Sequence, residues 1–240
     1  MCIKVSTNLS ITSWNVNGLF KRVNGDRICK LDDHQFSEVM NSDIVTFSEP
    51  HASSDDILAY NGFKCYMNCR KSETNRARGG LAIFVKKDIV TGIKLVDKSI
   101  SDLMWLKRDK QKFGLEKDLF LCFVYIPPAN SSYTLRTDCD KQIFEKLDQD
   151  ITKYSVLRDV ILMGDLNAHI NKNDLDFITD KLNDNLDDFL PTNYIADVVH
   201  KYRNTEIPQI TNSYGKQIIE VCTEAQLRIL NGRTLGDSGR

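Results

Sequence analysis

Short apolar segments rich in β-branched and aromatic residues recur along the chain, and turn residues separate them. Runs of this kind are typical of β-strands. The segments predicted as strands are Leu9–Trp14, Asp43–Ser48, Phe63–Met67, Leu81–Val85, Leu103–Leu106, Leu119–Ile126, Val160–Met163 and Arg228–Leu230. Residues 119–126 and 160–163 are apolar on both faces, which predicts central strands that are covered on both sides.

Between these strands, apolar residues recur at the spacing of a helix face. This spacing predicts helices over Ile28–Met40, Cys139–Tyr154 and Ser213–Gln226, the last with Asn212 as its N-cap. Two groups of strands with interleaved helices predict an α/β fold, a two-sheet sandwich flanked by helices. No Pro or Gly run marks a linker, so we expect one domain over residues 9–240 after an extension at 1–8.

Composition narrows the possible partners and the compartment. The 240 residues carry a formal net charge of −1, so a nucleic acid would have to be held by local Lys and Arg clusters. Seven cysteines without a C-x-x-C pair predict free thiols in a reducing compartment. No apolar stretch is long enough to span a bilayer and no leader precedes the domain, so we expect an intracellular protein, cytoplasmic or nuclear.

The sharpest chemical feature is Gly164-Asp165-Leu166-Asn167, at the end of an apolar strand. Because side chains alternate along extended chain, Asp165 and Asn167 point to the same side. Such a pair can orient a water against phosphorus and share a hard cation, since Mg²⁺ prefers oxygen ligands. The alternative interpretation is that both residues only begin a turn.

Three further strand ends carry polar side chains, and each has an ordinary structural explanation. Asn15 follows the first predicted strand, and asparagine is common in the turns that follow strands. Glu49 follows Asp43–Ser48 and fits a solvated position, with His51 on the surface beside it. Tyr125 precedes two prolines, where a core tyrosine is the default and hydrogen bonding to a phosphate oxygen the functional alternative.

Taken in order, these motifs resemble the endonuclease/exonuclease/phosphatase superfamily, and within it the endonuclease domain of non-LTR (LINE-type) retrotransposons. The resemblance extends from about Ser10 onward and rests on the Asn and Glu strand ends, the Gly79-Gly80 doublet before an apolar strand, Tyr125-Ile-Pro, and Gly164-Asp-Leu-Asn. It implies a DNase I-like sandwich and Mg²⁺- or Mn²⁺-assisted attack of water on a DNA phosphate.

The resemblance also implies a role for each matched residue. Glu49 would be the principal metal ligand with Asn15 beside it. Asp165 would align or deprotonate the attacking water, Asn167 would orient Asp165 and the phosphate, and Tyr125 would brace a phosphate oxygen. The family's Glu-Thr-His pattern has Pro50 at its middle position here.

The end of the chain departs from the family, whose members continue into a Ser-Asp-His that supplies the catalytic histidine. From this we expect a domain incomplete at its C-terminus and a weakened DNA-nicking phosphodiesterase. The alternatives are an inactive retrotransposon-derived fragment and a phosphatase of the same superfamily. Basic residues before Gly79-Gly80, Arg76 and Arg78 among them, fit either DNA contact or a solvated loop.

Overall fold

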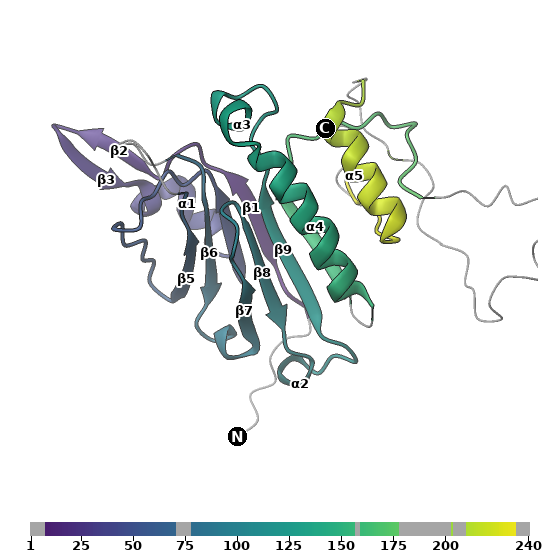
Figure 1. The fold of residues 1–240 in the computed structure, drawn as a ribbon. Coiled ribbons are helices and arrows are strands. Elements are labelled where there is room, and N and C mark those ends of the chain that lie inside the picture. Colours follow the sequence, from purple (N-terminus) through teal and green to yellow (C-terminus); the bar gives the residue numbers. More distant parts are fainter. Residues whose placement is uncertain (1–7, 71–77, 157–158, 178–202, 204–209, 234–240) are drawn as a thin grey trace, which may run out of the picture. The chain divides into compact units, whose positions relative to one another are not determined.

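The computed structural model describes residues 8–70, 78–156, 159–177, 203 and 210–233. The chain divides into two compact units, Met1–Asn167 and Ala168–Arg240. The first unit contains all of the described strands and the second contains one long helix (Figure 1).

Two four-stranded sheets form the first unit. One has the order β1-β4-β6-β5, and the other has the order β10-β9-β8-β7. The strands of the first sheet are β1 (Ile11–Asn15), β4 (Ile44–Ser48), β6 (Leu81–Lys86) and β5 (Phe63–Asn68). Those of the second are β10 (Asp159–Asp165), β9 (Leu119–Tyr125), β8 (Leu103–Arg108) and β7 (Ile93–Asp97).

Each sheet contains one parallel pair, β1 with β4 and β10 with β9, and its other pairs are antiparallel. Parallel strands end at the same edge of a sheet. The register pairs Asn15 with Ser48, the residue before Glu49, and pairs Asp165 with Tyr125. Strand pairing therefore brings Asn15 close to Glu49 at one edge of the first sheet, and Asp165 close to Tyr125 at one edge of the second.

The main core lies between the two sheets, where Ile83 and Val85 of β6 join Leu121 and Phe123 of β9 in one buried cluster. Because side chains alternate, the next residues along these strands face outward. Helix α1 (His34–Val39) contributes Phe36 to the cluster that covers the outer face of the first sheet. The predicted two-sheet sandwich flanked by helices is confirmed.

The outer face of the second sheet is covered by α4 (Cys139–Ser155), as Figure 1 shows. Its buried residues Ile143, Leu147 and Ile151 recur every four positions, which is the spacing of one helix face. Tyr154 stacks on Phe120 of β9 with ring centroids 4.4 Å apart. The helix predicted over Cys139–Tyr154 is thus confirmed with one additional residue.

The helix predicted over Ile28–Met40 is partly wrong. Its first residues belong to a hairpin of β2 (Phe20–Val23) and β3 (Asp26–Cys29), which forms a separate two-stranded sheet. The turn residues Asn24 and Gly25 have φ of 53° and 94°, and Asn-Gly favours such a left-handed turn strongly. Helical structure begins only with η1 (Lys30–Asp32) and continues in α1.

One other strand was missed and two strand predictions differ from the structure. β7 was not predicted, because Lys94 interrupts its short apolar run. β10 was predicted as a central strand, but it is the edge strand of the described sheet and Ile161 is 37% exposed. Arg228–Leu230 forms no strand. An apolar run reports the residue types of a strand, but not how many neighbours it pairs with.

The remaining short helices connect strands. They are η2 (Val90–Gly92), α2 (Lys110–Phe113) and α3 (Ser132–Thr137). No helix in the described part of the chain is long and apolar enough to cross a bilayer.

The second unit contains α5 (Ser213–Glu224), which begins as predicted at Asn212, whose side chain accepts a hydrogen bond from the Gly215 amide at 2.7 Å. A buried ion pair holds the segment that follows. Both terminal nitrogens of Arg233 lie 2.6 Å from the carboxylate oxygens of Asp176, which is 0% exposed. Asp176 also accepts from the Ile229 amide at 2.6 Å, so one carboxylate fixes the turn after α5.

Candidate active site

Hydrogen bonds join Asn15, Glu49 and Asp165 at the edge where the two sheets meet. The Nδ2 of Asn15 donates to Glu49 Oε1 at 2.9 Å and to Asp165 Oδ2 at 2.8 Å. Residues separated by as many as 150 positions are therefore in direct contact. Neither carboxylate pairs with a Lys or Arg among the described residues, so two acidic groups share one amide.

The backbone that presents Glu49 is held in an unfavourable conformation. Glu49 and His51 have φ of 53° and 51°, the left-handed region that non-glycine residues rarely adopt. The Gly80 carbonyl accepts from the Glu49 amide at 3.1 Å, and the Gly79 carbonyl accepts from the His51 amide at 3.3 Å. Left-handed backbone of this kind costs about 1–3 kcal/mol per residue and is concentrated at functional sites.

The surroundings of Glu49 keep its side chain ionised. Burial by itself raises a carboxyl pKa, but hydrogen bonds from Asn15, Tyr125 and His51 outweigh it and lower the pKa of Glu49 below its ordinary value. His51 Nε2 lies 3.1 Å from Glu49 Oε2. Glu49 thus receives donors on both oxygens while carrying a full negative charge.

Asp165 is fixed by the close approach of β10 to β9. A Cβ at Gly164 would lie 1.9 Å from the Val124 carbonyl oxygen, so only glycine fits before Asp165. Beyond the strand, the Asn167 amide donates to Asp165 Oδ1 at 3.2 Å, and Asn167 Nδ2 donates to the Ile126 carbonyl at 2.8 Å. Asn167 therefore ties the turn that carries Asp165 back to the end of β9.

Tyr125 connects the acids to a second buried group. Burial, and then its hydrogen bond to Glu49, raises the pKa of Tyr125 far above its ordinary value, so the hydroxyl stays protonated and donates. The guanidinium of Arg70 lies 5.2 Å from the Tyr125 ring centroid and 4.2 Å from that of Tyr133. The tyrosine behind Glu49 is thereby packed against a cation.

Arg70 is itself held by Asp102. Their side chains are 8% and 2% exposed, and Arg70 Nε donates to Asp102 Oδ2. Burial disfavours a charged guanidinium, but Asp102 keeps the pKa of Arg70 above its ordinary value. Asp102 also accepts from the Gly80 amide at 2.6 Å, so the pair reaches the same glycine that supports Glu49.

A cavity of about 1040 Å³ opens beside Glu49 and Tyr125. Among the described lining residues five are cationic and Glu49 is the one carboxylate. Three of the five cations pair with acids outside the lining, Lys21 with Asp33, Arg27 with Asp56 and Arg70 with Asp102. The cationic lining residues are Lys21, Arg22, Arg27, Arg70 and Arg78. Asn15 and Asp165 do not form part of this lining. Asn15 is connected to it by its bond to Glu49, and Asp165 by its bond to Asn15.

The donor set of this cluster fits a hard divalent cation. The carboxylate oxygens of Glu49 and Asp165 are the type of ligand that Mg²⁺ prefers, and Mg²⁺ typically takes one or two carboxylates. Asn15 presents its amide nitrogen to them, and its oxygen accepts from the Asn17 amide at 3.1 Å. Ligation by Asn15 stays a prediction that requires its amide to rotate. Within the described residues, no three His, Cys, Asp or Glu side chains form a metal site alone.

The structure places the other predicted residues as follows. Arg78 lines the cavity, whereas Arg76 lies outside the described residues. The metal-binding, water-aligning and phosphate-binding roles of the site residues stay predictions.

Sequence reasoning missed several residues that surround the site. His51 was expected on the surface, yet it contacts Glu49. Its position two residues after Glu49 was the available signal. Arg27 and Asp102 had none, because each is brought to the site by contacts between distant segments.

The model of the endonuclease/exonuclease/phosphatase family matches residues 12–217. Among solved structures, the AP endonuclease LMAP from Leishmania major is 17% identical, with a TM-score of 0.47, 71% of this chain covered and 58% of that chain. The 3′ phosphatase NExo from Neisseria, bound to a product DNA hairpin, is 17% identical with a TM-score of 0.41, and the covered shares are 70% and 61%.

A family protein from Leptotrichia buccalis is 12% identical with a TM-score of 0.37, and 67% of each chain is covered. No curated protein matches this sequence. The chain spans about three fifths of the length of the LMAP and NExo structures.

Proposed function

Because the chain belongs to the endonuclease/exonuclease/phosphatase family, we propose that it is a divalent-metal-dependent phosphodiesterase that cleaves DNA at the Asn15, Glu49 and Asp165 cluster. One observation carries the proposal: a single amide holds two carboxylates together without a Lys or Arg partner in the described residues. The Asn15 amide brings two acidic side chains close together, and a bound divalent ion would neutralise their charge.

The side chains have distinct tasks in this proposal. Glu49 and Asp165 would hold a Mg²⁺ or Mn²⁺ ion, which would supply charge stabilisation at a phosphate oxygen. Asp165 accepts one hydrogen bond on each oxygen and retains lone pairs for an attacking water, whose proton it accepts as a general base. Asn167 fixes the direction of that carboxylate. The protonated Tyr125 hydroxyl, which donates to Glu49 in the structure, exchanges this hydrogen bond for one to a phosphate oxygen when substrate binds.

Nicking of supercoiled plasmid tests the proposal. Purified chain with Mg²⁺ is expected to convert the plasmid to its open-circular form, and Asp165→Ala is expected to remove that activity. Asp159→Ala is a matched control, because Asp159 is an exposed aspartate at the other end of the same strand β10. Equal nicking by wild type and Asp165→Ala would show that another site, or a contaminant, does the chemistry.

We further propose that the chain acts on intact duplex as a retrotransposon-type endonuclease does. Support comes from the ordered set of Ser13–Gly18, Tyr125–Pro127 and Gly164–Asn167. Duplexes with no lesion, with one abasic site and with a 3′ phosphate end separate the family's activities. Cleavage of the intact duplex at a comparable rate is the expected result. Activity confined to the abasic site or the 3′ phosphate would contradict it.

A further inference from the structure

The β2–β3 hairpin places two arginines opposite each other. The register pairs Phe20 with Cys29, Lys21 with Ile28 and Arg22 with Arg27. Because side chains alternate, Phe20, Arg22 and Arg27 lie on one face of the hairpin. Like charges directly opposite in an antiparallel pair destabilise it. This face therefore carries an arrangement that folding alone does not favour.

Only one of these two arginines is compensated. Arg27 pairs with Asp56, donates to the His51 carbonyl at 3.2 Å, and stacks at 3.6 Å over the Phe20 ring. Arg22 is exposed and makes no hydrogen bond or ion pair with the described residues. The Phe20 ring and Asp56 thus hold one guanidinium still, while the other extends free beside it.

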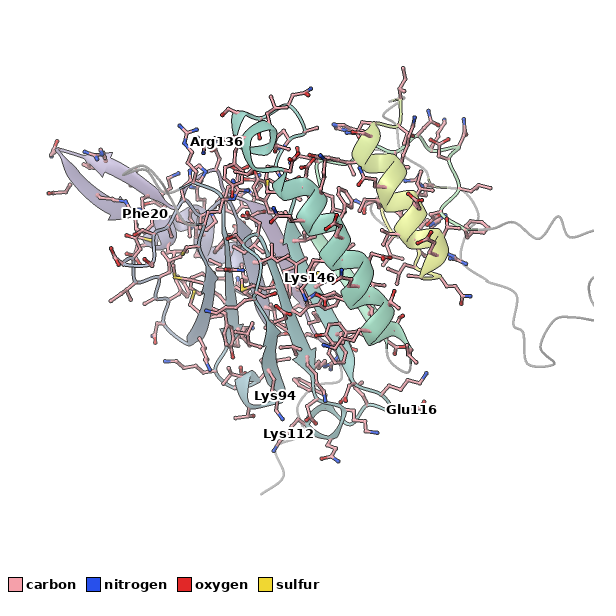
Figure 2. The ribbon with its side chains drawn as sticks, in the orientation of Figure 1. Phe20, Lys94, Lys112, Glu116, Arg136 and Lys146 are labelled. Atoms are coloured by element: carbon pink, nitrogen blue, oxygen red, sulfur yellow. The ribbon has the colours of Figure 1, made fainter. Side chains whose placement is uncertain are left out.

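This face of the hairpin lines the cavity that contains Glu49 and Tyr125. Phe20, Arg22 and Arg27 lie on its wall with Arg78. Figure 2 labels Phe20 at the base of the hairpin, which is separate from both large sheets. The contact of Arg27 with the His51 carbonyl connects this wall to the strained Glu49–His51 backbone.

We propose that Arg22 and Arg27 together bind a phosphate of the DNA strand, next to the phosphate that is cleaved. The proposal rests on the proposed function and adds the residues that hold the strand. Guanidinium groups bind phosphate oxygens with two parallel hydrogen bonds each, and a phosphate between two arginines turns their repulsion into attraction. The cavity volume leaves room for this second phosphate beside the reacting one.

Equilibrium binding without metal tests this separately from cleavage. The affinity of the 240-residue chain for labelled duplex and single-stranded DNA is measured in EDTA, between about 50 and 200 mM salt. For Arg22→Ala, the slope of log affinity against log salt is expected to shrink by about 0.9 on duplex and about 0.7 on single strands. Arg22→Lys keeps the charge and is expected to keep the slope.

Thermal unfolding separates binding from a structural role. Arg22→Ala removes repulsion from the free protein, so its Tm is expected to equal or exceed that of wild type while its DNA affinity falls. Lys112→Ala removes an exposed cation at the far end of the sheets (Figure 2) and is expected to change neither.

Three results would overturn the inference: no DNA binding by wild type at low salt, a wild-type slope for Arg22→Ala, or a Tm that falls with its affinity. If Arg22→Ala has the wild-type slope and wild type nicks plasmid with metal, the phosphate-binding role of the two arginines is wrong and the proposed function stands. If Arg22→Ala has a reduced slope but wild type fails to nick, the phosphate-binding role stands and the proposed function is wrong.

Discussion

Two sets of inward-facing carboxylates in this chain have opposite surroundings. Asp176, in the second unit, is fully buried and meets both terminal nitrogens of Arg233. Glu49 and Asp165, in the first unit, are partly exposed and meet each other across the Asn15 amide. Asp176 is neutralised by a cation of the chain itself, whereas the two acids at Asn15 have no Lys or Arg partner among the described residues.

This difference separates a structural acid from a functional one. A buried carboxylate with a bidentate arginine and a backbone amide has its charge compensated in the folded chain. Two acids held together by an amide keep a charge that a cation from outside can neutralise. Arg70 and Asp102, next to the site, also compensate each other within the chain, through one bond from Arg70 Nε, and the Gly80 amide connects Asp102 to the backbone that supports Glu49.

The largest expected effect is on activity. Glu49→Gln and Asp165→Asn keep the side-chain shapes and remove one negative charge each, so the cleavage rate is expected to fall on the order of 10²–10⁴-fold. Unfolding free energy is expected to fall only modestly for Glu49→Gln, because hydrogen bonds from Asn15, Tyr125 and His51 favour the ionised Glu49 in the folded chain, and to stay close to wild type for Asp165→Asn. Plasmid nicking and urea unfolding of the same preparations measure both quantities. A large loss of stability would mean that Glu49 and Asp165 are structural carboxylates like Asp176.

Asp176→Asn is expected to show the opposite pattern. Removing one partner of a buried ion pair leaves Arg233, whose side chain is 2% exposed, without its counter-charge and costs about 3–5 kcal/mol. Hydrogen exchange of residues 213–233 measures the loss where it occurs. Asp148→Asn, at an exposed aspartate of α4, is the control for removing a charge. Unchanged exchange in Asp176→Asn would contradict the structural role.

Gly164→Ala is expected to reduce stability and activity together. Its Cβ would meet the Val124 carbonyl and push β10 away from β9, which costs about 1–3 kcal/mol and displaces Asp165. Gly62→Ala is matched to it, because Gly62 also has a positive φ but has open space around its Cβ position. If the two variants unfold at the same urea concentration, the close approach of β10 to β9 has no energetic consequence.

Acid titration gives the smallest effect and concerns Asp176. Burial raises the pKa of a carboxyl, but the bonds from Arg233 and Ile229 outweigh it and lower the pKa of Asp176. A lowered folded pKa means stabilisation that is complete above the unfolded pKa, about 3.9, and is lost as pH falls through the folded value. The exchange difference between wild type and Asp176→Asn is therefore expected to shrink below about pH 4. If the exchange difference between wild type and Asp176→Asn grew below about pH 4, the pKa of Asp176 would be raised in the folded chain and not lowered.

Sequence predicted the sheets and the long helices well, because apolar periodicity reports directly which strand and helix faces are buried. Residues 139–154 and 119–126 are examples in which one local pattern determined the element. The hairpin at 20–29 was missed because the apolar Ile28 and Leu31 fit a helix spacing, although Asn24-Gly25 carried the turn signal. The edge position of β10 depends on which strands lie beside it, and its own residues do not encode that.

The candidate site was predictable as far as strand ends carry their own side chains. Asn15, Glu49 and Asp165 follow apolar strands, and parallel pairing brings such ends to one edge. The contacts around them were less predictable. The nearness of His51 to Glu49 in the sequence was a signal, but their contact depends on a left-handed backbone at both residues. Arg27 reaches the site through the β2–β3 hairpin, which was not predicted.

Binding of Mn²⁺, followed by electron paramagnetic resonance or calorimetry, tests the central claim most directly. Wild type and Asp159→Ala are expected to bind one ion at the carboxylate cluster, and Glu49→Gln and Asp165→Asn are expected to lose it. Equal stoichiometry and affinity in all four proteins would contradict the claim that Glu49 and Asp165 are held together to share a cation.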